Sequence, residues 1–341
     1  MLLLPVSWLY GKIAYIRNAL YDRGTLRSYD LGARTVSIGN ITTGGTGKTP
    51  LVAYVAEILA DTGEKVCILT RGYGRADLGE RVLVSDWDNV LVDARIGGDE
   101  PVELARKLLG KAVVVADADR VSAAAWAKEK FGVTAFVLDD GFQHRRVKRD
   151  VDIVCIDATD PFGHGSMLPA GSLREPLENL SRADAIILTR CELVEDLRNV
   201  ISKIEALNSD AVIFHSTNDV RELTELAMFL ESKRGESHLS QETSALAFCG
   251  LGNPDVFFRS VVRAGYDLKA TEAFRDHYYF TQSDIDILER RARENEIEVL
   301  ITTAKDAVKL EGINFSIPCF VMEIQIAIDD ADAFRKLITS S

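Results

Sequence analysis

Ser37-Ile-Gly-Asn-Ile-Thr-Thr-Gly-Gly-Thr-Gly-Lys-Thr49 is the stretch that decides the fold of this chain. Its glycine-rich turn leads into a Lys-Thr pair, and glycines let backbone N–H groups point into the turn. A β-branched run precedes it at residues 34–38, and Pro50 opens an apolar segment that ends near Gly63. Strand, loop and helix thus occur in the order of a phosphate-binding loop, which predicts a nucleoside-triphosphate-binding α/β domain.

Each part of this loop has a role in phosphate binding. Lys48 reaches the β- and γ-phosphates, the Thr49 hydroxyl is a ligand for Mg²⁺, and the following helix N-terminus adds positive potential. Thr42 stands where the strict G-x-x-x-x-G-K-[ST] pattern has glycine, so the shape of the loop differs from that pattern. We expect the nucleotide to contact a continuous run of residues: Thr42, Thr43, Gly44, Gly45, Thr46, Gly47, Lys48 and Thr49.

The composition limits the function classes. A chain of 341 residues is long for a single core, and its hydrophobic share of 47% is ample for two domains. The formal net charge of −12 argues against a nucleic-acid-binding protein, which needs a basic surface. The five cysteines include no C-x-x-C pair and four lie in apolar runs, so we expect buried, reduced thiols in a cytoplasmic environment.

The first 25 residues differ from the rest of the chain. Apolar residues recur at helical spacing at Leu9, Ile13, Ile16 and Leu20, and basic residues stud the same segment. The apolar stretch is shorter than the roughly 20 residues that span a bilayer, and it lacks the basic start and cleavage site of a signal peptide. Its aromatic residues favour an interfacial membrane helix, and a helix packed on the protein's own core is the alternative.

Short apolar runs alternate with helical segments after the loop. They lie at residues 66–69, 112–116, 135–138, 151–156 and 185–188. The alternation predicts a parallel sheet covered by helices on both faces, with ligands at the carboxyl ends of the strands. A polar stretch at 193–241 holds a domain boundary, and further runs follow at 245–248, 299–301 and 319–324. We expect an α/β protein of three parts: an amphipathic membrane helix (1–25), a phosphate-loop domain (26–215) and a smaller C-terminal α/β domain (216–341).

Aspartates follow three of these strands, and a nucleotide-bound Mg²⁺ needs such a carboxylate. The candidates are Asp117, the pair Asp139 and Asp140, and Asp157. Spacing alone does not choose between them, although a double aspartate can both approach a metal and orient it. Thr189-Arg-Cys-Glu192 also follows a strand and resembles the base-reading [NT]-K-x-D motif of GTPases, so Glu192 is a candidate for contact with the base and GTP stays possible.

Two further residues have the chemistry of proton transfer. Asp99 lies in the turn Gly97-Gly-Asp-Glu-Pro101, where a carboxylate can accept the proton of an alcohol, although an acidic residue there is more often a helix N-cap. His277 lies among aromatic residues, where it can pair with Asp99 or simply pack at the surface. The basic residues at 145, 146, 148 and 149 indicate either a solvated turn or an anionic substrate.

Eight short blocks are spread over most of the chain. The most specific is Leu138-Asp-Asp-Gly-Phe-Gln-His144, and the others lie at 39–50, 71–74, 98–101, 168–171, 173–177, 276–277 and 302–307. Together they resemble the tetraacyldisaccharide 4′-kinase family. Ala304 departs from the glutamate that is common at its place in that family. The resemblance implies a bacterial enzyme that uses Mg-ATP to phosphorylate the 4′-hydroxyl of the acylated lipid A disaccharide 1-phosphate, giving lipid IVA.

The resemblance also implies a place and a set of roles. The enzyme would lie on the cytoplasmic leaflet of the inner membrane, where the N-terminal helix brings it to its lipid; we expect neither nucleic acid nor an obligate protein partner. The implied roles are phosphate contact for Lys48 and Thr49, metal binding for Asp139, Asp140, Thr49 and Gln143, proton acceptance for Asp99 with His277, charge compensation for Arg174, and substrate contact for Arg71 and His144.

Two other function classes are weighed against a kinase. A membrane-bound regulatory ATPase of the septum-positioning or plasmid-partition type also combines a phosphate loop with an amphipathic helix. However, Thr43 stands where its signature lysine belongs, and such a switch has no need of Asp99 and His277. A GTP-dependent metal-insertion chaperone would need a Cys/His cluster, which the sequence lacks.

Overall fold

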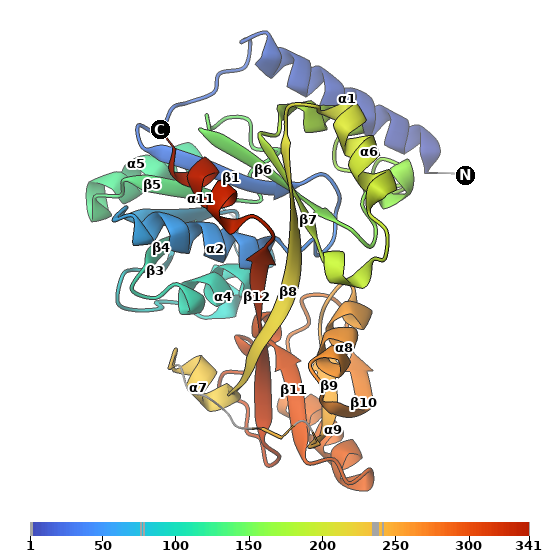
Figure 1. Cartoon of the computed structure of the whole chain (residues 1–341). Coiled ribbons are helices and arrows are strands. Elements are labelled where there is room, and N and C mark those ends of the chain that lie inside the picture. Colours follow the sequence, from blue (N-terminus) through green and yellow to red (C-terminus); the bar gives the residue numbers. More distant parts are fainter. Residues whose placement is uncertain (1–2, 76, 78, 234–238, 241, 341) are drawn as a thin grey trace.

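The computed structural model describes residues 3–75, 77, 79–233, 239–240 and 242–340. Within them, one sheet of 12 strands runs through the molecule in the order β10-β9-β11-β12-β8-β7-β6-β1-β5-β2-β4-β3 (Figure 1). The strands are β1 (Arg34–Asn40), β2 (Val66–Thr70), β3 (Val82–Ser85), β4 (Ala112–Ala116), β5 (Ala135–Asp139), β6 (Val151–Asp157), β7 (Ala185–Thr189), β8 (Val212–Glu225), β9 (Ser244–Cys249), β10 (Asp267–Ala273), β11 (Val299–Thr303) and β12 (Cys319–Ile328). The α-helices are α1 (Leu4–Asp22), α2 (Lys48–Asp61), α3 (Ala94–Gly97), α4 (Asp99–Lys107), α5 (Arg120–Phe131), α6 (Arg198–Leu207), α7 (Leu226–Leu230), α8 (Pro254–Arg263), α9 (Gln282–Glu294), α10 (Ala304–Ala307) and α11 (Ala331–Thr339).

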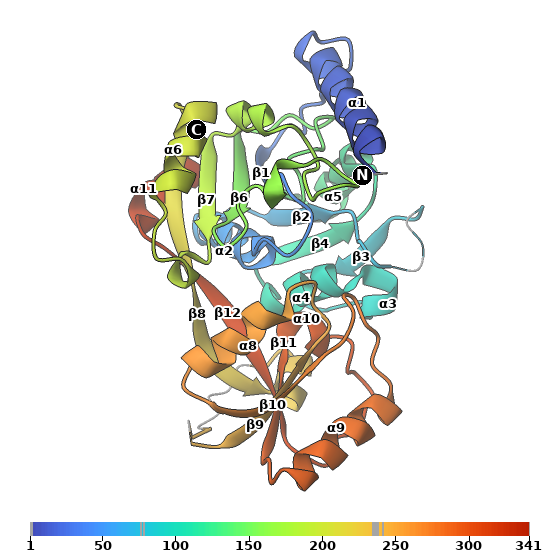
Figure 2. The same cartoon turned by 90° about the vertical axis from the view of Figure 1, so that its right-hand side faces the viewer.

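The first lobe, β1 to β7 with its helices, has the predicted parallel sheet. β7, β6, β1, β5, β2 and β4 are parallel neighbours, and β3 pairs antiparallel with β4 at the edge. The central strands are buried because α2 and α4 pack on one face and α5 and α6 on the other (Figure 2). All the apolar runs predicted as strands are strands, and the α/β class is confirmed.

The second lobe is smaller and consists of β9 to β12 with α8, α9 and α10. β10, β9, β11 and β12 are parallel, so their carboxyl ends share one edge of the sheet. β3, β8 and β10 are absent from the sequence-based prediction. β3 has four residues at one edge of the sheet, and β10 lies at the other edge with alternating, partly exposed side chains, so neither shows a long apolar run.

β8 joins the two lobes. Val212 to His215 pair in parallel with β7, and Ser216 to Glu225 pair antiparallel with β12. This strand of 14 residues therefore carries the sheet from the first lobe into the second (Figure 1). The boundary expected between residues 215 and 216 falls where the strand changes partner, and the three-part division stays a proposal. Residues 234–238 and 241, within the predicted polar boundary stretch, lie outside the described residues.

The C-terminal helix returns to the first lobe. The Phe334 ring in α11 stacks on Tyr54 of α2 with a centroid distance of 6.0 Å, and Arg34 donates a hydrogen bond of 2.6 Å to the Ile338 carbonyl oxygen. Through these contacts, the C-terminal helix packs against α2 and β1 of the first lobe. All five cysteines are free thiols, and Cys67, Cys155, Cys249 and Cys319 are buried, as predicted.

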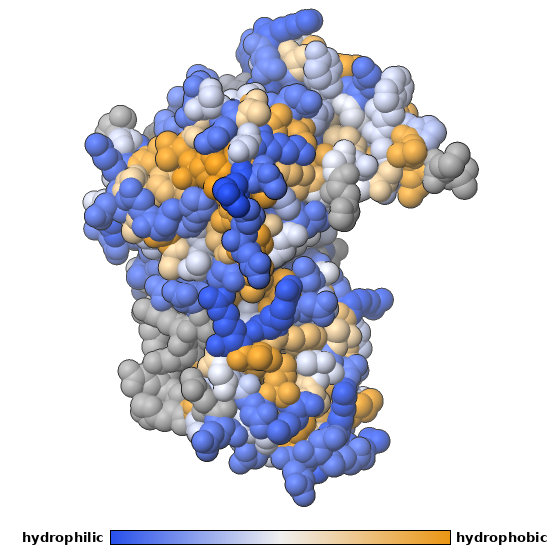
Figure 3. All heavy atoms as spheres, turned by 45° about the vertical axis from the view of Figure 1, so that its right-hand side comes forward, coloured by the Kyte–Doolittle hydropathy of each residue, from blue (hydrophilic) through white to orange (hydrophobic). Residues whose placement is uncertain are grey.

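α1 lies on the outside of the first lobe (Figures 1 and 2). Its buried residues are the polar Ser7 and Asn18, whereas Trp8 is 66% and Ile13 is 59% exposed. Figure 3 shows apolar groups among polar ones on this projecting part. Most large apolar residues of α1 are therefore exposed, whereas Ala14, Ala19 and Leu20 in its second half are partly buried. Among the described residues, the structure has no helix with the length and hydropathy needed to cross a bilayer.

Candidate active site

The phosphate loop connects the end of β1 to the start of α2. Gly44 and Gly47 have φ angles of 110° and 76°, a region that residues with a Cβ rarely adopt. Two residues at the end of β7 hold the loop: the Thr189 hydroxyl donates to the Thr46 carbonyl at 2.9 Å, and Arg190 donates to the Gly45 carbonyl at 2.6 Å. The predicted strand, loop and helix are therefore all present.

Asp140 lies directly after β5 and faces the loop. Its carboxylate is 3.4 Å from the Lys48 ammonium and accepts two hydrogen bonds from Arg174, of 2.6 and 2.8 Å. Arg174 also donates to the Asn40 side chain at 3.1 Å. Burial raises the pKa of Asp140, but the charge of Lys48 and the bonds from Arg174 outweigh it and hold the pKa well below its ordinary value. Asp140 is therefore ionised.

Asp139 is the last residue of β5 and has a different environment. It is buried and accepts a hydrogen bond of 2.8 Å from the Thr70 hydroxyl. Burial, followed by the negative charges of Glu100 and Asp140, raises the pKa of Asp139 to about 6, against the opposing charge of Lys48. A cation placed next to this carboxylate would relieve that penalty.

Several buried polar atoms near the loop have no hydrogen-bond partner among the described residues: Asn40 Nδ2, Thr46 Oγ1 and Gln143 Oε1. Gln143 is fixed through its Nε2, which donates to the Asn40 carbonyl at 2.9 Å. Thr49, Asp139, Asp140 and Gln143 offer the oxygen ligands that Mg²⁺ prefers, with phosphate oxygens and water to complete its shell. The described residues contain no group of three or more His, Cys, Asp or Glu side chains that could hold a metal.

Asp99 and His277 form a pair across the two lobes. Asp99 begins α4, and His277 follows β10; its Nδ1 lies 2.8 Å from Asp99 Oδ2. The other oxygen, Oδ1, accepts the backbone N–H of Glu100 at 3.0 Å, and Asp99 is 3% exposed. Gly98, not Asp99, is the N-cap of α4, so the alternative that Asp99 is an N-cap is wrong.

Lysines of the second lobe surround this pair. Lys305 Nζ lies 3.5 Å from His277 Nε2 and 3.1 Å from Asp276, and Lys309 Nζ lies 3.6 Å from Asp99 Oδ2. Burial raises the pKa of Asp99, but the His277 hydrogen bond and the lysine charges outweigh it and lower the pKa. The hydrogen bond with Asp99 raises the pKa of His277 against burial and the charge of Lys305.

The loop after β2 connects the two groups of residues. Thr70, the last residue of β2, donates a hydrogen bond to Asp139. A Cβ placed on Gly74 in the loop would lie 3.6 Å from His277 Nδ1 and 3.9 Å from Asp99 Oδ1. The Glu100 charge, one residue from Asp99, also acts on Asp139. The end of β2 and the loop that follows it therefore lie beside both groups of residues.

The other sequence candidates lie around this site. Asp117 accepts a hydrogen bond of 2.8 Å from Arg81, and Asp157 is paired with Arg190, so each already has a cationic partner. Arg71 is exposed directly after β2. Burial, then the charges of Arg120, Arg149 and Arg146, lowers the pKa of His144 to about 4, so the imidazole is neutral at pH 7. Glu192 Oε2 is buried with no hydrogen-bond partner among the described residues.

Some residues of the site carry no assigned role in the sequence analysis: Asn40, Thr70, Glu100, Lys305 and Lys309. Thr70 had a visible signal, because it is the polar residue that closes an apolar run. Lys305 stands inside one of the family-like blocks, but its block gives no role for it. Lys309 gives no signal in the sequence, because its importance comes from burial beside a residue 210 positions earlier in the chain.

Comparisons with known proteins match the chain to one kinase family. The sequence model of the family described as tetraacyldisaccharide-1-P 4′-kinase, LpxK, matches residues 1–341. The chain is 37% identical over 336 residues to a tetraacyldisaccharide 4′-kinase of Halothermothrix orenii, covering 94% of this chain and 87% of that protein. It is 39% identical over 344 residues to the one of Pelobacter propionicus, covering 99% and 92%. Among solved structures, the "apo" form of LpxK from Aquifex aeolicus in complex with ATP matches with a TM-score of 0.79 and 34% identity, covering 98% of this chain and 97% of that chain.

Proposed function

The chain belongs to the tetraacyldisaccharide-1-P 4′-kinase family, and we propose that it transfers the γ-phosphate of ATP to the 4′-hydroxyl of tetraacyldisaccharide 1-phosphate, giving lipid IVA. The observation that carries this proposal is the Asp99–His277 pair in a chain that also has a phosphate loop. A regulatory ATPase needs the loop but has no alcohol to deprotonate. The pair gives an acceptor alcohol a place to leave its proton, which favours the kinase.

ATP binding is assigned to the first lobe. Within residues 42–49, backbone N–H groups other than those of Thr43 and Thr46, which donate to the Ser172 and Gly44 carbonyls, bind the phosphates together with the Lys48 ammonium. Lys48 Nζ lies 3.4 Å from Asp140 Oδ1, so the ammonium group is directed to the end of β5, where we place the negatively charged phosphates and their metal ion. Glu192 is assigned to the base because its buried Oε2 lacks a partner among the described residues.

Mg²⁺ is assigned to Asp139, Asp140, the Thr49 hydroxyl and Gln143 Oε1. When bound, the ion neutralises charge on the phosphate oxygens. Two observations support the assignment. Burial and neighbouring negative charges raise the pKa of Asp139 to about 6, a penalty that a cation would relieve, and Gln143 Oε1 has no hydrogen-bond partner among the described residues.

The transfer step needs a nucleophile, a leaving group and a proton acceptor. The 4′-hydroxyl oxygen attacks the γ-phosphorus while the bond from that phosphorus to the β–γ bridging oxygen breaks, and ADP leaves. The hydroxyl proton passes to the Asp99–His277 pair. Asp99 is held on both oxygens before substrate arrives, by Glu100 N–H and by His277. Arg174 compensates charge that grows on the transferring group.

Substrate contact is assigned to Arg71 and His144. The exposed guanidinium of Arg71 suits an anionic sugar phosphate, and the neutral imidazole of His144 can donate or accept one hydrogen bond without adding charge. Both residues come from loops at the carboxyl ends of first-lobe strands, β2 and β5, where ligands bind in such sheets.

The outer face of α1 is assigned to the cytoplasmic leaflet of the inner membrane. Exposed apolar and aromatic side chains such as Trp8, Leu9 and Ile13 on a helix with basic residues fit an interfacial anchor. Vesicles of phosphatidylglycerol and phosphatidylethanolamine should carry the protein in flotation, and Ile13→Asp should reduce that fraction. Ile287→Asp is the matched control, since Ile287 in α9 is 56% exposed. Equal loss in both variants would contradict the assignment.

The function is tested by transfer of labelled γ-phosphate from ATP to tetraacyldisaccharide 1-phosphate in detergent micelles. We expect label in the lipid with the native protein and almost none with Lys48→Ala or without lipid. Release of labelled inorganic phosphate with none in the lipid would overturn the kinase and favour the regulatory ATPase.

A further inference from the structure

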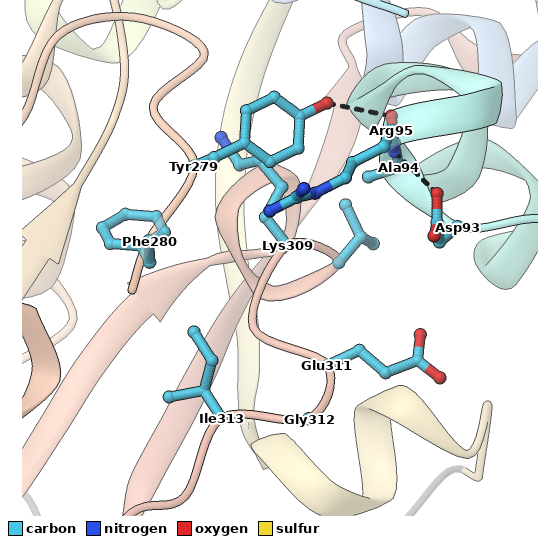
Figure 4. Close-up of a pocket in the computed structure, with 10 residues that line it drawn as sticks. Asp93, Ala94, Arg95, Tyr279, Phe280, Lys309, Glu311, Gly312 and Ile313 are labelled. Carbon is cyan, nitrogen blue, oxygen red and sulfur yellow. Dashed lines mark hydrogen bonds between the residues drawn. The ribbon is translucent and has the colours of Figure 1, made fainter. Parts of the chain in front are cut away.

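Lys309 is a lysine with no exposed side-chain surface, an unusual state for an ammonium group. It follows α10 in the second lobe, and its Nζ lies between two carboxylates: 2.8 Å from Asp306 Oδ1 and 3.6 Å from Asp99 Oδ2. Figure 4 shows Lys309 with Tyr279, Phe280 and Arg95 around a hollow between the lobes, lined also by Glu311 and Ile313. A buried charge of this kind is retained at a cost unless it is paired, so its place needs a reason.

Asp306 fixes this lysine within the second lobe. It is fully buried, and its Oδ2 accepts the Thr303 hydroxyl at 2.8 Å and the Gly250 N–H at 2.9 Å. The contact with Lys309 is an ion pair, and neither Lys309 Nζ nor Asp306 Oδ1 makes a directed hydrogen bond to any described residue. The ammonium therefore has donors left for Asp99.

We propose that Lys309 is a positioning residue for the phosphoryl transfer. Its ammonium shares the Asp99 Oδ2 oxygen with His277 and thereby sets the strength of the Asp99–His277 hydrogen bond, while the Asp306 carboxylate neutralises part of the lysine charge. The proposal rests on the proposed role of Asp99. Lys309 and His277 approach the same oxygen at 3.6 and 2.8 Å, and both come from the second lobe. The lobes must therefore be in contact for Asp99 to have either partner.

Because of the charges around this pair, the proposal predicts that two substitutions shift the pKa of His277 in opposite directions. Asp99 is faced by His277, Lys305, Lys309 and Tyr279 from the second lobe and by Glu100 and Glu103 on its own helix; His277 is also faced by Asp276 and by the Tyr73 ring. Lys309→Met removes the competitor for Oδ2, which strengthens the bond to the imidazolium and raises the pKa of His277. Asp306→Asn leaves the lysine charge uncompensated, which weakens that bond and lowers the pKa of His277.

The test is the pKa of His277, followed by NMR on protein labelled with ¹³C at histidine, with His277→Gln to assign its signal. We expect shifts of about half a pH unit or more, upward in Lys309→Met and downward in Asp306→Asn. Lys309→Arg keeps the charge and should stay close to the native value. The acid limb of kcat/KM for lipid phosphorylation should move in the same directions.

A merely structural role would lower the melting temperature in both variants without opposite shifts. Equal pKa values, or shifts of the same sign, would overturn the proposal. If Lys309→Met does not fold, Asp306→Asn alone decides, because an unchanged or higher pKa of His277 contradicts it. Asp99→Ala distinguishes failure of the proposed function of Asp99 from failure of the role of Lys309. If this variant keeps full phosphate transfer, Asp99 is not the proton acceptor. If it is inactive while the Lys309 and Asp306 variants leave the pKa of His277 unchanged, only the role of Lys309 is overturned.

Discussion

The phosphate loop and the Asp99–His277 pair are built in different ways. The residues around the loop lie at the ends of adjacent parallel strands of one lobe, so a single sheet brings Lys48 to Asp140 and Thr70 to Asp139. The pair joins residues 178 positions apart, one from each lobe. The proposed roles thus assign nucleotide binding to the first lobe and proton transfer to a pair of residues that needs both lobes.

Asp140→Asn is the strongest test of the first region. The carboxylate that faces Lys48 and binds Arg174 twice would lose its charge, and the proposed metal site would lose a ligand. We expect kcat for lipid phosphorylation to fall about a thousandfold or more and ATP binding, measured by calorimetry with Mg²⁺, to weaken. Asp88→Asn, at an exposed position of the first lobe, is the control. Near-native transfer by Asp140→Asn would mean that the paired aspartates are not part of the site.

Asp99→Asn should separate the two regions. The amide cannot accept a proton, but it keeps the size of the side chain, so we expect kcat to fall about a hundredfold to a thousandfold with unchanged ATP affinity. The same phosphate-transfer assay and calorimetry measure both quantities. A loss of ATP affinity as large as that of Asp140→Asn would break the distinction between a binding lobe and a transfer interface.

Glu103→Gln tests the charge balance of α4, the helix that carries Asp99. Burial, then the charge of Glu100 against that of Lys107, raises the pKa of the Glu103 carboxyl from its ordinary 4.5 to about 8. A raised pKa in the folded state stabilises the fold at low pH, and this stabilisation is lost as the pH rises from about 4.5 through about 8. Because Glu103 is partly exposed, we expect the variant to be more stable than the native protein at pH 9 by about 1–3 kcal/mol.

Urea unfolding at pH 6 and pH 9 measures the free energy of unfolding of both proteins. Glu57→Gln, a partly exposed glutamate on α2 in the first lobe, is the control for the substitution itself. The same pH dependence in the native protein and in Glu103→Gln would show that Glu103 is not the group that makes α4 sensitive to pH.

The two regions also differ in how far the sequence predicts them. The loop is local, so glycine spacing, a Lys-Thr pair and neighbouring apolar runs predict strand, turn and helix, and parallel strands bring the following aspartates to the same edge. Asp99 and His277 have no such local signal: the residues alone allow the pairing but also a surface histidine, and the resemblance to a kinase family favours the pair. Lys309 escapes prediction altogether, because nothing in Val308-Lys-Leu310 shows that its side chain is buried against another lobe.

The strand β8 escapes prediction for a related physical reason. A strand that changes its pairing partner halfway does not present one side to a single hydrophobic core. The alternation of apolar and polar residues that predicts a strand is therefore not visible in its sequence. The parts of this protein that connect the lobes are thus the parts that the sequence predicts least well.

Tyr279→Phe is the mildest test of the contact between the lobes. The Tyr279 hydroxyl of the second lobe donates to the Ala94 carbonyl of the first at 3.1 Å, and its ring lies 5.4 Å from the Arg95 guanidinium (Figure 4). Phenylalanine keeps the ring contact and loses one hydrogen bond, worth about 1 kcal/mol, so we expect kcat to fall about fivefold with unchanged ATP affinity.

Tyr29→Phe is its matched control, because the Tyr29 ring lies at the same 5.4 Å from Arg146, in a contact within the first lobe. If Tyr279→Phe slows transfer and Tyr29→Phe does not, a single bond between the lobes contributes to the alignment of Asp99 with His277. If both variants keep the native kcat, the charged contacts of Lys309 and His277 with Asp99 are sufficient to align the lobes, and only those contacts remain as the link between them. If Tyr279→Phe weakens ATP binding instead, the first lobe does not bind nucleotide independently, and the distinction between the two regions fails at its mildest point.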